Sequence, residues 1–99
     1  MEKKREIYRE KAEARFEQMN ARIEELLAKF NAAKADARLK INNQFEDLTE
    51  RRETVVQKMK QLNNAGEDAW QDMRSGLDKA FDDLEHSFNQ ATHKFENLI

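Results

Sequence analysis

The chain has no proline, no cysteine and only two glycines among its 99 residues. Proline and glycine interrupt helices most strongly, so their scarcity favours helix over β-turns and over disorder. The lack of cysteine excludes disulfide bonds and thiolate metal sites. Sustained alternation of apolar and polar residues is also absent, which argues against β-strands. These absences together predict an all-α protein.

Long apolar runs are absent as well, since no run exceeds three residues. This excludes a transmembrane span. Hydrophobic and charged residues each make up 38% of the chain, whereas a typical globular domain is roughly 45–50% apolar and about 25% charged. The apolar material is enough for a narrow stripe on a helix. We expect a cytoplasmic protein, because no apolar segment follows the charged start and the lack of cysteine suits a reducing compartment.

Apolar residues recur every three or four positions along almost the whole chain, which is typical of a coiled coil or a helical bundle. We predict long amphipathic helices that form an antiparallel coiled coil or helical hairpin, which assembles into an oligomeric helix bundle. The expected core and oligomer-interface residues are Phe16, Met19, Ile23, Leu26, Phe30, Ala33, Ala37, Ile41, Phe45, Leu48, Val55, Met59, Leu62, Trp70, Leu77, Phe81, Leu84, Phe88, Ala91, Phe95 and Leu98.

The rhythm of the stripe divides the chain into two expected helices. Residues 1–62 form one long helix with a stutter near 37–45, where a spacing of four repeats and locally unwinds a supercoil. Residues 63–66 form a turn or a kink, because Asn or Gly can take the left-handed position that ends a helix. The stripe nevertheless passes through Gly66, so a continuous helix stays open as the alternative. Residues 67–98 form a Phe-rich helix.

Charge is distributed unevenly along the chain. Residues 1–40 carry a net charge of +3 and residues 63–99 carry −5. Opposite charges can steer orientation, so this asymmetry favours antiparallel pairing of the two ends, within one chain or between two. A short helix covers only half of a 62-residue one, and the uncovered half needs a partner. We therefore expect a homo-oligomer, either an antiparallel dimer or a larger bundle.

Few residues offer chemistry. The only histidines, His86 and His93, lie seven positions apart, and Asp83 three residues before His86 echoes the carboxylate-x-x-His pattern of di-iron bundles. The register of the stripe places both histidines on the outer face, so they are weak metal candidates. We expect no cofactor, no bound metal and no catalysis, because no nucleophile–base set is readable. The basic start is interleaved with glutamates and the pI is 5.7, which argues against nucleic-acid binding.

The segment 66–98 suggests a second kind of function. It is an amphipathic helix with Trp70 and phenylalanines at Phe81, Phe88 and Phe95, as in apolipoprotein-like and phasin-like helices that coat a surface. Its polar face is acidic, which disfavours an anionic membrane. A neutral lipid or a polymer granule remains an open alternative.

The stretch Gly66-Glu67-Asp68-Ala69-Trp70, with Met73 and Gly76 after it and a Phe-rich helix beyond, resembles the C-terminal signature of small bacterial coiled-coil domain proteins of uncharacterised function. The Ala/Lys-rich segment 21–60 is similar to their upstream helix. This resemblance implies a helical protein that is not membrane-embedded, and it brings no catalytic residues with it.

These observations predict a structural or interaction protein that acts by helix-mediated self-association and protein binding. Coating of a lipid or granule surface is the alternative, and a metal-binding helix bundle is a weaker one.

Overall fold

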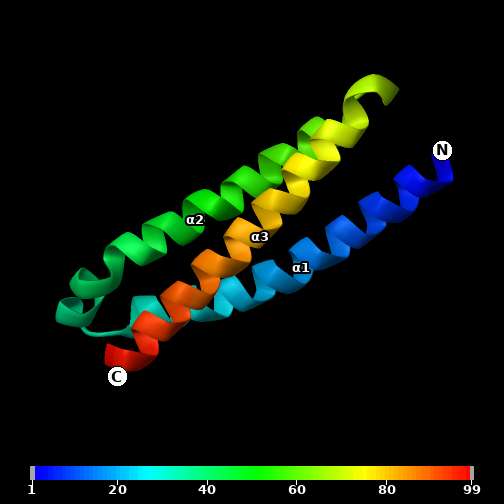
Figure 1. The fold of residues 1–99 in the computed structure, drawn as a ribbon. Coiled ribbons are helices and arrows are strands. Elements are labelled where there is room, and N and C mark those ends of the chain that lie inside the picture. Colours follow the sequence, from blue (N-terminus) through cyan, green and yellow to red (C-terminus); the bar gives the residue numbers. More distant parts are fainter. Residues whose placement is uncertain (1, 99) are drawn as a thin grey trace.

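The computed structural model describes residues 2–98, which form three long helices (Figure 1). Helix α1 spans Glu2–Ala32, α2 spans Ala35–Asn63 and α3 spans Glu67–Leu98. The helices lie side by side in a bundle of 51 × 18 × 17 Å. The chain reverses direction twice, so α1 and α3 run parallel and both are antiparallel to α2. The described residues contain no strand, and the all-α prediction is confirmed.

The prediction of one helix over residues 1–62 is wrong, because the chain folds back at Ala33 and Lys34. Lys34 is extended, with φ −63° and ψ 150°, and no side chain caps the start of α2. The break forfeits a few backbone hydrogen bonds, each with a net contribution of about 1 kcal/mol. Folding back buries the apolar side chains of α1, at roughly 1.5–3 kcal/mol for each large one. Burial outweighs the loss. The expected stutter near 37–45 lies within α2, which is unbroken there.

The second connection joins α2 to α3 at residues 64–66. Asn64 ends α2 in a right-handed conformation, with φ −99° and ψ 0°, and its N–H donates to the carbonyls of Lys60 and Gln61. None of the residues 2–98 has a positive φ, so the left-handed ending expected here is wrong. A Cβ added at Gly66 would meet no atom within 4 Å, and the turn therefore does not depend on a glycine.

Helices α2 and α3 pack closely as an antiparallel hairpin. Small side chains of α3 permit this approach, since Ala80, Ser87 and Ala91 are all buried. Large residues of α2 such as Phe45 and Leu48 belong to the same buried core. Alternation of small and large side chains at facing positions is what allows neighbouring helices to interdigitate.

The apolar stripe forms a core within a single chain. Leu98, at the end of α3, is 37% exposed and lies outside the core of the single chain, so its place at an oligomer interface stays a prediction. Phe16, Phe30, Ala33, Ala37 and Met59 are half-buried. The buried residues among those predicted are Met19, Ile23, Leu26, Ile41, Phe45, Leu48, Val55, Leu62, Trp70, Leu77, Phe81, Leu84, Phe88, Ala91 and Phe95.

The additional break changes two expectations about the ends of the chain. Because α1 folds back over the hairpin, no long helix projects beyond it. Burial of the stripe therefore does not by itself require a second chain. The basic first segment does pair with the acidic last one, but in the parallel direction, so the antiparallel orientation expected within one chain is wrong. Three helices require two reversals of the chain, so the first and last helices run parallel. Two helices would have required one reversal and would have run antiparallel.

Candidate interaction surface

The seam between α1 and α3 is built from arginines laid over aromatic rings. We define the α1–α3 seam as Tyr8, Arg15 and Arg22 with Trp70, Arg74, Phe81 and Phe88. In each of its three main contacts the partners are 66 residues apart in the chain. Positions seven apart share a helix face, so the contacts follow one line down the bundle. The guanidinium carbon lies 4.8 Å from the ring centre in Tyr8–Arg74, 4.7 Å in Arg15–Phe81 and 4.8 Å in Arg22–Phe88.

The seam begins at Trp70, near the end of the bundle where α2 turns into α3. Trp70 is 7% exposed, and its ring meets the Tyr8 ring in a T-shaped arrangement, with centroids 5.6 Å apart and planes at 78°. The guanidinium groups of Arg5 and Arg74 lie 5.6 and 5.8 Å from the Trp70 ring centre. The surface is hollowed beside the ring, between Arg5 and Leu62. Cation–π contacts of this kind contribute about 0.5–1 kcal/mol each at exposed sites.

Tyr8 also joins α1 to α3 through its hydroxyl, which donates a hydrogen bond to the carboxylate of Asp78. Burial raises the pKa of the Tyr8 hydroxyl well above its usual value of 10.0, and the hydrogen bond to Asp78 and the charge of that carboxylate raise it further. Each of these effects favours the protonated phenol. Tyr8 is therefore a neutral donor throughout the physiological pH range.

Arg15 combines stacking with ion pairs. While it lies over Phe81, one of its Nη atoms is 3.4 Å from Asp82 Oδ1 and 3.2 Å from Glu85 Oε2. These carboxylates are largely exposed, and exposed pairs contribute little individually. Their effect is to hold the guanidinium plane against the ring. The basic first helix and the acidic third helix thus meet through specific pairs.

Arg52 joins α1 to α2 at a position where the apolar stripe is interrupted. Its Nη1 donates to Asn20 Oδ1 at 3.2 Å and to Glu24 Oε1 at 2.6 Å. The side chain is only 24% exposed, so its stem covers apolar surface while its head reaches the carboxylate. The packing of α1 on α2 and on α3 therefore depends on arginine side chains as well as on apolar contacts.

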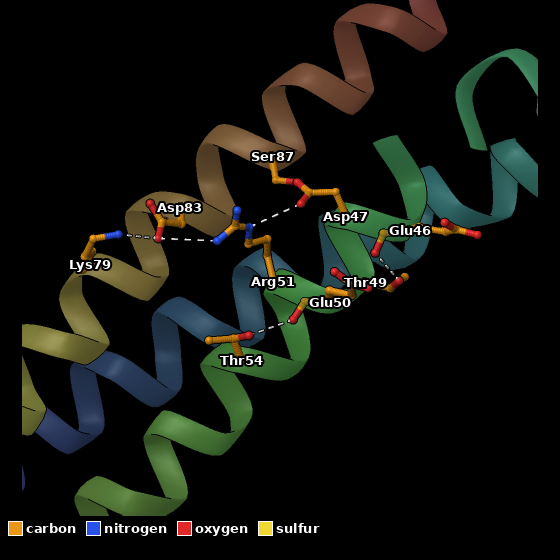
Figure 2. A network of polar contacts seen from close by, with 9 residues as sticks. All are labelled: Glu46, Asp47, Thr49, Glu50, Arg51, Thr54, Lys79, Asp83 and Ser87. Atoms are coloured by element: carbon orange, nitrogen blue, oxygen red, sulfur yellow. Dashed lines mark hydrogen bonds and ion pairs between the residues drawn. The ribbon is translucent and has the colours of Figure 1, made fainter. Parts of the chain in front are cut away.

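A chain of polar contacts crosses the outer face of the α2–α3 hairpin, as Figure 2 shows. Lys79 Nζ lies 2.9 Å from Asp83, and Arg51 lies 3.8 Å from Asp83 and 3.4 Å from Asp47. The hydroxyl of Ser87, which is 3% exposed, donates to Asp47 at 2.7 Å. The hydrogen bond from Lys79 lowers the pKa of Asp83, and the nearby Lys79 and Arg51 charges lower it further. This network fixes the register of the hairpin.

His86 and His93 both lie on the exposed face of α3. The imidazole of His93 has Asn97 Nδ2 at 3.3 Å. Asp83, the carboxylate of the expected metal pattern, is engaged by Lys79 and Arg51 instead. Within the described part of the chain, no three His, Asp, Glu or Cys side chains gather where they could hold a metal ion.

The sequence reasoning did not identify the α1 side of this seam. Arg15 was considered only as part of the basic start, and no role was predicted for Tyr8 or Arg22. Their spacing of seven, matched by the spacing of seven at Arg74, Phe81 and Phe88, was the available signal. Long arginine stems beside aromatic rings at one heptad position indicate a covered seam.

Comparison of the chain with family models, with curated proteins and with solved structures gives no match. None of the helices within residues 2–98 is both long enough and apolar enough to cross a membrane.

Proposed function

We propose that this protein is a helical interaction protein, which acts by self-association and by binding helices of other proteins. In self-association two chains pair as an antiparallel dimer, with helix α1 as the element that binds. The resemblance of the segment 66–84 to small bacterial coiled-coil proteins agrees with this proposal.

One observation carries the proposal: the α1–α3 seam places an arginine over an aromatic ring every seven residues with a constant offset of 66, the arginine coming from α3 at Tyr8 and from α1 at Phe81 and Phe88. A repeating seam is a recognition surface that any helix with the matching pattern can occupy, including α1 of a second copy. Arg15 makes the seam directional, because its guanidinium meets both the Phe81 ring and the carboxylates of Asp82 and Glu85. Such a seam specifies its partner more narrowly than an apolar stripe alone.

Light scattering of the purified protein over about two decades of concentration tests self-association. We expect the mass to rise above the 11.7 kDa of one chain as the concentration increases. A mass of one chain over the whole range would remove self-association and leave only the binding of other proteins. Isothermal titration with a synthetic peptide of residues 2–32 then tests whether the chain binds an added helix of the α1 pattern.

The aromatic residues of α3 that α1 covers favour a second function. Beneath it lie Trp70, Phe81 and Phe88, which form the aromatic face of α3. Release of α1 would present this face to a neutral lipid or polymer surface, as in amphipathic helices that coat such surfaces. Co-sedimentation with zwitterionic and anionic liposomes tests this function. Binding to zwitterionic liposomes supports it, and failure to sediment with either removes it.

A further inference from the structure

The connection between α1 and α2 contains nothing that prevents a continuous helix. Its sequence from 31 to 37 is Asn-Ala-Ala-Lys-Ala-Asp-Ala, which has four alanines and neither glycine nor proline. Alanine is the strongest helix former and lysine is also favourable. Lys34 is the N-cap of α2, yet its side chain makes no cap hydrogen bond. The bend is therefore imposed by the packing of α1 on the hairpin and not by the local sequence.

The apolar stripe also passes the bend without changing face. Phe30, Ala33, Ala37 and Ile41 follow one another at spacings of three and four. If residues 2–63 formed one straight helix, its α1 half and its α2 half would present their apolar residues on the same side. A straight helix would therefore still need its α1 half covered, and it would offer the same stripe to whatever covers it.

A second copy of the chain supplies that cover. In the closed chain α1 is held by the α1–α3 seam and by Arg52, which reaches Asn20 and Glu24. Every one of these contacts joins α1 to the hairpin and none requires the connection at Ala33 and Lys34. Each can be made equally by α1 of one copy and the hairpin of another, because identical elements exchange at low cost.

Within residues 2–98, two of the three exposed large apolar residues lie at the end of the bundle where two such copies would meet. Three large apolar residues of the described chain are exposed, namely Ile7, Leu39 and Leu98. Leu39 is 78% exposed in the second turn of α2, and Leu98, 37% exposed, ends α3. Both lie at the end of the bundle that holds the α1–α2 connection, where the C-terminus also lies (Figure 1). Two straightened copies related by a two-fold axis meet at this end.

From these observations we propose that two copies of the chain exchange helix α1. The connection at Ala33 and Lys34 straightens, residues 2–63 become one helix, and each α1 packs on the partner's α2–α3 hairpin. This inference rests on the proposed self-association, for which it supplies the partner and the moving part. The dimer is then two three-helix bundles joined end to end by two straight helices.

The proposal predicts a distinctive length. A straight helix over residues 2–63 extends roughly 93 Å at about 1.5 Å per residue, whereas the closed bundle is 51 Å long. An exchanged dimer is therefore about as long as its straight helices, and a dimer of two closed bundles packed side by side stays near the length of one. Small-angle X-ray scattering coupled to size exclusion measures this dimension for each separated species.

The substitution Ala35→Pro separates the two states. Proline is favoured at the first position of a helix, which Ala35 occupies in α2, and it requires an extended residue before it, which Lys34 already is. Inside a straight helix the same proline is strongly unfavourable, by a factor of roughly a hundred for each chain that straightens. Ala35→Pro thus fits the closed chain and opposes exchange, while Ala35→Ser is the matched control that permits both.

The experiment refolds the wild type and both variants from denaturant at high concentration and compares them by scattering. We expect wild type and Ala35→Ser to form a dimer with a long dimension of about 93 Å or more, and Ala35→Pro to lose most of it while keeping its helical circular dichroism. A compact dimer, or one that Ala35→Pro forms equally well, overturns exchange but leaves self-association standing. Monomers alone at every concentration overturn both. If Ala35→Pro fails to fold, the length of the wild-type dimer decides.

Discussion

The guanidinium carbon of Arg15 lies 4.7 Å from the centre of the Phe81 ring, at the middle of the three main contacts of the α1–α3 seam. The same arginine reaches the carboxylates of Asp82, which directly follows Phe81, and of Glu85, one turn further along α3. The relationship fixes α1 along the hairpin in both register and direction. Because one side chain makes all of these contacts, a single substitution removes them together.

Replacing Arg15 with alanine should lower the free energy of unfolding by about 1 kcal/mol, because the cation–π contact and the ion pairs are lost together. Chemical denaturation followed by circular dichroism measures the change. Arg38→Ala is the control, since Arg38 is exposed in the first turn of α2, and its effect should be within about 0.5 kcal/mol. Equal effects of the two substitutions would show that Arg15 contributes no more to the free energy of unfolding than an exposed arginine does.

Alkaline pH should destabilise the protein through Tyr8, which is the only tyrosine. The pKa of its hydroxyl is raised in the folded chain above its usual value of 10.0. The unfolded state therefore ionises first, so the contribution of Tyr8 is complete below pH 10.0 and declines as the pH rises above it. Tyrosinate absorbance should titrate at higher pH in the folded protein than in denaturant. Tyr8→Phe keeps the ring but should lose this part of the alkaline decline. If the titrations of the folded and unfolded protein coincide, the Tyr8 hydroxyl is neither buried nor hydrogen-bonded to Asp78 in solution.

Ser87→Ala should lower stability by about 1 kcal/mol, because it removes the hydrogen bond to the Asp47 carboxylate from a buried position. The chain offers a matched control, since Ser75 is the only other serine and is exposed on the same helix. Ser75→Ala should be close to neutral. A loss at Ser75 as large as the loss at Ser87 would contradict the role given to the network of Figure 2.

Gly76→Ala should stabilise the protein by about 0.5–1 kcal/mol. Gly76 lies within α3, its backbone is not left-handed and a Cβ placed there meets no atom within 4 Å. The gain comes from the lower conformational entropy of the unfolded chain. A thermal midpoint below that of the wild type would mean that α3 needs the glycine, in a state other than the closed bundle.

The sequence allowed the helical class and most of the core to be predicted, because positions such as Ile23, Leu26 and Leu84 follow the three-four spacing without interruption. It did not allow the fold-back at Ala33 and Lys34 to be predicted. Alanine and lysine give no local signal for a break, and the bend arises from contacts between α1 and residues far along the chain.

The direction of α1 was missed for a related reason. Net charge indicates which segments attract each other, and the first and last segments do meet at Arg15 and Glu85. Whether the two segments run parallel depends on how many times the chain reverses between them. The unpredicted break at Ala33 and Lys34 adds a second reversal and makes them parallel. The arginines of the seam were not predicted, because an arginine in an isolated helix sequence indicates a solvent-exposed position. Only the folded chain brings it over an aromatic ring of another helix.

The most direct test of helix-mediated self-association is thermal unfolding, followed by circular dichroism over about two decades of protein concentration. If the chains associate through α1, dilution dissociates them and the midpoint falls, so we expect a midpoint that rises with concentration. A midpoint that is the same at every concentration, for a species with the 11.7 kDa mass of one chain, would contradict it.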